Sequence, residues 1–193
     1  MKLKYAVIIL IVFFNHLLFS NDYHKKAQDL SKAYDNYIKF PDIRMSEKIF
    51  FDLFPNTFCE LDSIYGFNKK PGPLYFNSAD HIVGLFFELK SINEEEYLQK
   101  LINISINGHW DADAINYFQT GMRNHVMSNL QLTFILLAQY SDDQIESFFY
   151  FFFDGIHPRW KEIPDFFTEY KNEYPNIYQQ LEKGFLKAIN NNG

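Results

Sequence analysis

The chain has 193 residues and a formal net charge of −6, with 24 acidic residues against 18 lysines and arginines. Hydrophobic residues make up 47% of it and charged residues 22%, which excludes an intrinsically disordered chain. The single cysteine, Cys59, excludes an intramolecular disulfide framework, and its expected place is the core. The unusual feature is an aromatic content of 19%.

The first twenty residues have the pattern of a secretory signal peptide. Lys2 and Lys4 form a positive start, and an apolar run over residues 5–14 follows. This run is shorter than the roughly 20 apolar residues that a spanning helix needs. We expect residues 1–20 to be a signal peptide cleaved after Ser20, with an uncleaved N-terminal anchor as the alternative. The abundant Phe, Ile, Asn, Lys and Tyr are typical of AT-rich bacteria, so the expected location is periplasmic or secreted, in a Gram-negative organism.

Loss of residues 1–20 would remove two lysines and no acid, so the balance becomes 24 acids against 18 − 2 = 16 bases, or −8. An acidic chain with three arginines is poorly suited to a nucleic-acid backbone or to an anionic membrane surface. We therefore expect no nucleic acid, and no membrane after signal cleavage. A basic protein is the partner that this charge favours.

Helix-start signals recur along residues 21–193, which we expect to form a single all-helical domain. Ser141 with Gln144 has the spacing of a capping box, and Thr57, Asn93 and Asp111 are further expected N-caps. The apolar spacing agrees with these starts. The expected helices span residues 22–39, 46–54, 57–65, 78–90, 93–107, 111–124, 127–140, 141–154, 164–172 and 175–190.

Short connections between these helices predict antiparallel neighbours. The expected fold is all-α, a compact multi-helix bundle of antiparallel short helices, and the alternative is a short α-solenoid. Residues 66–77 contain Pro71, Gly72 and Pro73, which predict a long loop.

Six consecutive aromatic residues, Phe148 to Phe153, cannot share one face of a helix, because successive side chains are about 100° apart. The run indicates either the central helix of the bundle or a helix that is partly an interaction surface. Aromatic and arginine side chains are enriched at binding hot spots. The residues expected to contact a partner are Phe153, His157, Arg159 and Trp160, together with the acidic Glu94 and Glu95.

One segment has the residue types of a metal or acid–base site. His109, Asp111 and Asp113 place an imidazole and two carboxylates within five residues, and His125 could join them from a neighbouring helix. Helix capping explains the two aspartates equally well, and no HExxH or EF-hand pattern accompanies them. We therefore expect neither a metal nor a cofactor.

Nucleophile elbows, glycine-rich phosphate loops and dinucleotide fingerprints are absent from the sequence. The sequence favours an exported non-enzymatic protein-binding domain, in its sharpest form an immunity or inhibitor-type partner of a secreted toxin. One alternative is a hydrophobic-ligand carrier with its Phe-rich helices around a cavity. The other is a small metal-dependent hydrolase that uses His109, Asp111 and Asp113.

Overall fold

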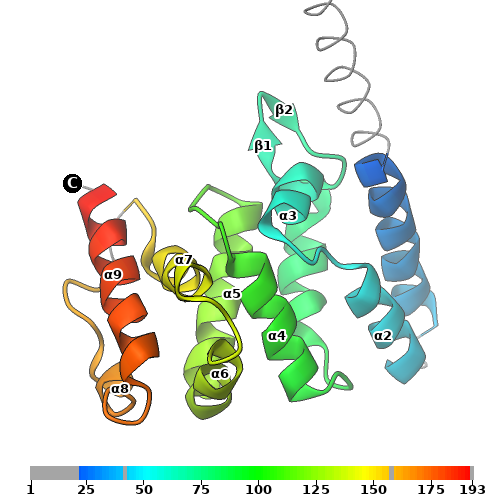
Figure 1. The fold of residues 1–193 in the computed structure, drawn as a ribbon. Helices are drawn as coiled ribbons and strands as arrows, with labels where there is room; N and C mark the ends of the chain where they lie inside the picture. The colour runs from blue at the N-terminus through cyan, green and yellow to red at the C-terminus, as the bar shows by residue number, and fades with distance from the viewer. Residues whose placement is uncertain (1–21, 41–42, 157–158, 192–193) are drawn as a thin grey trace, which may run out of the picture.

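The computed structural model of the protein describes residues 22–40, 43–156 and 159–191. The signal peptide expected at residues 1–20 lies outside these ranges. The helices follow one another in chain order across the molecule, from the blue helix of residues 22–39 to the red α9 at the opposite end (Figure 1). Buried apolar side chains from Ala27 to Ala188 form one continuous core cluster. The all-α multi-helix fold expected from the sequence is confirmed.

Most of the expected helices are present, but those expected at residues 127–140 and 164–172 are shorter, because their ends form turns. After residues 22–39 come α2 (Ile43–Leu53), α3 (Phe58–Tyr65), α4 (Glu94–Ser105), α5 (Ala114–Ser128), α6 (Leu130–Leu137), α7 (Asp142–Phe153), α8 (Asp165–Thr168) and α9 (Pro175–Asn191). The loop predicted at residues 66–77 contains a two-residue hairpin of β1 (Phe67–Asn68) and β2 (Lys70–Pro71), followed by the 3-10 turn η1 (Tyr75–Asn77). Within the described ranges, no helix has the length and apolarity to cross a membrane.

Three of the four expected N-caps are confirmed. Ser141 and Gln144 form the capping box, Asn93 accepts the N–H groups of the first turn of α4, and the Thr57 hydroxyl accepts the N–H of Glu60. The fourth was wrong, because α5 begins at Ala114, after a turn that ends at residue 113. The capping rule identified the right segment and placed the N-cap two positions too early, at Asp111 instead of Asp113.

The continuous helix expected at residues 78–90 is interrupted. The structure has a π-helical turn η2 (Ala79–Val83), a turn at Gly84, and a 3-10 turn η3 (Phe86–Glu88). Buried hydrogen bonds hold this irregular backbone, since the Tyr97 hydroxyl donates to the Phe86 carbonyl at 2.5 Å. Local apolar spacing cannot show such a partner from another helix, so the sequence predicted a regular helix instead.

The helix of residues 22–39 lies against α3. The Nζ of Lys26 is 2.6 Å from Glu60 Oε2, and the Tyr23 hydroxyl is 3.7 Å from the sulfur of Cys59. Cys59 is exposed, so the expectation that it would be buried in the core was wrong. Its position on α3 faces the neighbouring helix through a polar contact rather than an apolar one.

Helix α7 carries a large part of the aromatic core, and rings from five other helices pack against it. Four of its phenylalanines are completely buried and the fifth, Phe153, is 3% exposed. Their rings contact rings of several elements, including Phe58 of α3, Phe118 of α5, Phe134 of α6, Phe167 of α8 and Phe185 of α9. These rings pack against one another, whereas the carrier hypothesis placed them around a cavity.

The crossing of α7 and α9 depends on a glycine. A Cβ at Gly184 would lie 2.6 Å from the carbonyl oxygen of Glu146 and 2.7 Å from the amide nitrogen of Tyr150. Both are backbone atoms of α7, so a side-chain rotation cannot relieve the overlap. The two helices therefore approach as closely as their backbones allow.

The last turn of α7 is capped by side chains of α5. Gln119 Nε2 donates to the carbonyl oxygens of Phe151 and Asp154 at 2.5 and 2.9 Å. Arg123 donates from Nε to Phe152 O at 2.6 Å and from Nη2 to Asp154 O at 2.7 Å. Carbonyls at a helix end lack partners within the helix, and here buried side chains from another helix supply them.

Replacing Gly184 with alanine should destabilise the protein by about 2 kcal/mol or more, because the new methyl group overlaps backbone atoms of α7. Chemical denaturation measures the change. Gln179→Ala on the exposed side of α9 is the matched control and should change stability by less than about 0.5 kcal/mol. Equal stability of the two variants would contradict the close crossing.

Replacing Arg123 with methionine should destabilise the protein by about 2 kcal/mol, because the carbonyl of Phe152 loses its buried donor and that of Asp154 keeps only Gln119. The exposed Arg44 of α2 provides the comparison, and Arg44→Met should be nearly neutral. A two-state denaturation curve for each variant gives the difference. An Arg123→Met protein as stable as Arg44→Met would show that these hydrogen bonds contribute little.

Candidate functional site

The residues of the hydrolase hypothesis point to different neighbours. The exposed His109 ring lies against Phe58, with ring centroids 4.7 Å apart. The carboxylate of Asp111 accepts the N–H of Ala112 at 2.7 Å, and that of Asp113 accepts the hydroxyl of Tyr75. In the part of the chain that the structure describes, no group of three His, Cys, Asp or Glu side chains could hold a metal ion.

His125 lies on α5 and pairs with an acidic residue from α4. Its Nε2 is 2.6 Å from Glu94 Oε1, and its ring stacks on Tyr97 at 4.5 Å between centroids. From the sequence, His125 was a possible member of the metal or acid–base site, and Glu94 was expected to contact a partner. In the structure these two side chains pair with each other. Spacing gave no sign of this pair, because the two residues are 31 positions apart.

The partner-contact residues at the end of α7 have different environments. Phe153 is buried among Trp160, Phe167 and Phe185, so its expected role as an exposed contact residue was wrong. The aromatic run continues around α7 to its last residue, which turns this side chain into the core. Arg159 is exposed and lies over the half-buried ring of Trp160 at 5.0 Å. The fourth residue of this group, His157, lies outside the described residues.

Three elements near the start of α4 carry exposed acidic side chains. We call them the acidic edge: Asp52 of α2, Glu88 of η3, and Glu94, Glu95 and Glu96 of α4. All five are exposed. Both Glu94 and Glu88 act electrostatically on Tyr97, although burial is the larger reason why the pKa of Tyr97 is raised far above its usual range. The sequence predicted the α4 acids, but not Asp52 and Glu88, because they come from other elements.

Glu47 fixes the loop that precedes α4. This buried carboxylate is 2% exposed, and its Oε2 accepts the N–H of Ser91 at 2.7 Å, its hydroxyl at 2.5 Å and the N–H of Lys90 at 3.1 Å. The loop is therefore tied to α2, and Asn93 then caps α4. These contacts place the acidic edge on a rigid support.

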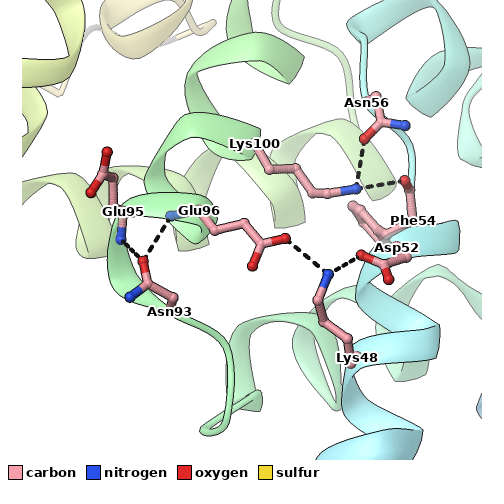
Figure 2. A network of polar contacts seen from close by, with 8 residues as sticks. All are labelled: Lys48, Asp52, Phe54, Asn56, Asn93, Glu95, Glu96 and Lys100. Carbon is pink, nitrogen blue, oxygen red and sulfur yellow. Dashed lines mark hydrogen bonds and ion pairs between the residues drawn. The ribbon is translucent and has the colours of Figure 1, made fainter.

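Two lysines, Lys48 of α2 and Lys100 of α4, connect α4 to α2 and to the segment that follows α2, as Figure 2 shows. Lys48 bridges Asp52 and Glu96, with its Nζ 2.9 Å from Glu96 Oε1. Lys100 donates to the carbonyl of Phe54 at 3.0 Å and to the side chain of Asn56 at 2.7 Å. Burial lowers the pKa of Lys100 to about 8. The ammonium groups of Lys48 and Lys100 therefore both have partners within the protein, and these contacts set the position of α4 relative to α2.

A histidine outside the acidic edge is buried in the core. His81 of η2 is 1% exposed, its Nδ1 is 2.9 Å from the Tyr65 hydroxyl, and its ring lies 4.3 Å from that of Tyr34. Burial lowers its pKa to about 4, against the opposing effect of the carboxylates of Asp80 and Asp35. A neutral imidazole inside an aromatic cluster acts as a core residue.

Comparison with known protein families, with curated proteins and with solved structures found no match for this chain. Its function therefore has to be argued from the acidic edge and the surfaces beside it.

Stability should fall as the pH decreases from about 6.5 to 4, because His81 binds its proton less readily in the folded state than in the unfolded state. The full loss attributable to this group is about 3 kcal/mol, present below pH ~4 and absent above pH ~6.5. Denaturation curves across this range should have a shallower pH dependence for His81→Phe than for the unmodified protein. The exposed His24→Phe is the control, and an unchanged slope for His81→Phe would contradict the assignment.

Proposed function

We propose that this protein is an exported, non-enzymatic binding protein that associates with a basic protein through its acidic edge. The observation that carries this proposal is the set of five exposed carboxylates that α2, η3 and the first turn of α4 contribute around the start of α4. Ion pairs with Lys48 occupy Asp52 and Glu96, and Glu94 is hydrogen-bonded to His125, whereas Glu88 and Glu95 have no ion pair among the described residues. A field of this kind accelerates and orients the approach of a positively charged surface.

The charge of the whole chain supports the same partner class. The acidic excess becomes −8 if residues 1–20 are removed on export, and the three arginines are Arg44, Arg123 and Arg159. Arg123 is buried and committed to the last turn of α7. The sharper form of the proposal is an immunity or inhibitor-type protein that covers the basic, functional surface of a secreted toxin in the periplasm.

Capture experiments test the proposal. The tagged protein, incubated with periplasmic and secreted fractions of its own organism, should retain a basic protein, identified by mass spectrometry, and should release it as salt rises. Reversing the charge of Glu95, by Glu95→Arg, should weaken this association about tenfold or more, because it adds repulsion to a lost attraction. Calorimetry with the purified partner measures the affinity.

Glu169→Arg is the matched control, since Glu169 is exposed next to α8 and far along the chain from the acidic edge. It makes the same change in net charge and should leave the affinity nearly unchanged. Equal losses in the two variants would show that total charge, and not this edge, determines binding. Retention of no basic protein in any fraction would refute the proposed function.

A further inference from the structure

A groove of about 510 Å³ runs beside α5, next to the acidic edge. One wall comes from η2 and η3, where Val83, Phe87 and Glu88 line it, and the other wall is the outer face of α5. We call it the α5 groove. It shares Glu88 with the acidic edge, and His125, the partner of Glu94, lies in its lining.

The α5 wall has a regular row of small polar side chains. Asn116, Thr120, Asn124 and Ser128 all line the groove and follow one another at intervals of four residues. Residues four apart lie on one face of a helix, about 6 Å apart along its axis. An extended peptide repeats every two residues, over about 6.6 Å. The row can therefore meet alternate residues of an extended chain, with amide and hydroxyl groups that both donate and accept hydrogen bonds.

The opposite wall and the floor of the groove offer apolar surface for the side chains of a bound peptide. Phe87 and Val83 supply apolar surface, with Val83 51% exposed. The ring of Phe87 lies directly on Gly121, where a Cβ would overlap it. Because position 121 has no side chain, this ring can lie flat against α5 and the groove stays open above it.

The charge of the lining selects against anions. Lys and Arg are absent from the ten lining residues, and Glu88 contributes a carboxylate. Glu94, hydrogen-bonded to His125, adds a second carboxylate at the same end. A lysine or arginine side chain placed at this end would meet two carboxylates, whereas a phosphate or carboxylate group would be repelled.

We propose that the α5 groove binds an extended peptide segment whose basic side chain reaches Glu88 and Glu94. This inference rests on the proposed function for the identity of the partner, because the segment would belong to the basic protein that the acidic edge attracts. The polar row on α5 pairs with the peptide backbone, and Phe87 and Val83 contact its alternate side chains. The length of the row, about 18 Å from residue 116 to residue 128, corresponds to five or six peptide residues.

The test uses peptides and does not need the natural partner. Pools of acetylated and amidated octapeptides, each with one position fixed as Lys, Arg, Glu or Ser, are titrated into the isotope-labelled protein. The Lys and Arg pools should shift the backbone amide signals of Thr120, Asn124 and His125, and should bind about tenfold or more tightly than the Glu pools. Added salt should reduce this preference.

Thr120→Arg should abolish binding, since it places a cation and a long side chain in the groove at an exposed position. Asn124→Ala should weaken binding several-fold, because it removes one pair of hydrogen-bonding groups. Gln179→Arg adds the same charge on the exposed side of α9 and should bind peptide normally. Near-identical thermal unfolding of the variants separates these effects from misfolding.

Several results would overturn the inference. They are equal binding of the Glu and Lys pools, shifts confined to other surfaces, and shifts of the same amides by maltohexaose, which would make the groove a carbohydrate site. A natural partner that binds Thr120→Arg normally but fails to bind Glu95→Arg would refute the groove and leave the proposed function intact. Peptide binding in the groove without capture of any basic protein would refute the proposed function and leave peptide binding by the groove intact.

Discussion

The phenylalanines of α7 project over about 200° of the circumference of their helix, so the protein can bury them only by packing other helices against several sides of it. Rings from α3, α5, α6, α8 and α9 contact them from different directions. Burial of so much aromatic surface is the main stabilising contribution available to a chain of this size. The arrangement of the remaining helices follows from this requirement.

Two features of neighbouring helices make that packing possible. Gly184 lets α9 approach the backbone of α7, and Gln119 and Arg123 of α5 satisfy the carbonyls at its buried end. Without such donors, a helix end in the core would leave polar groups without partners, at a cost that burial of a ring would barely offset. These buried polar side chains therefore allow the end of α7, with its aromatic side chains, to lie in the core.

The surface that we assign to function is built on this frame and joins the aromatic core through the rings of Phe87 and His125. Glu47, Lys48 and Lys100 join α2 to α4 and hold the acidic edge in position, and α5 presents one face to the core and the opposite face to the groove. Acidic side chains in the first turn of α4 also stabilise that helix through its dipole. The same residues therefore serve both helix stability and the attraction of a basic partner.

The existence of most helices, the N-caps of α4 and α7 and the burial of most of the aromatic run could be predicted from the sequence, because they depend on residues within one or two turns of each other. The interruption at η2, the exposure of Cys59 and the burial of Phe153 were not, since each depends on contacts with another element.

The same distinction applies to the candidate site. The sequence by itself determined an acidic, all-helical chain with glutamates at the start of α4. Only the tertiary structure brought Asp52 and Glu88 to those glutamates, paired His125 with Glu94, and separated His109, Asp111 and Asp113 among different neighbours. Local patterns specify secondary structure, whereas the packing of distant helices decides which side chains meet.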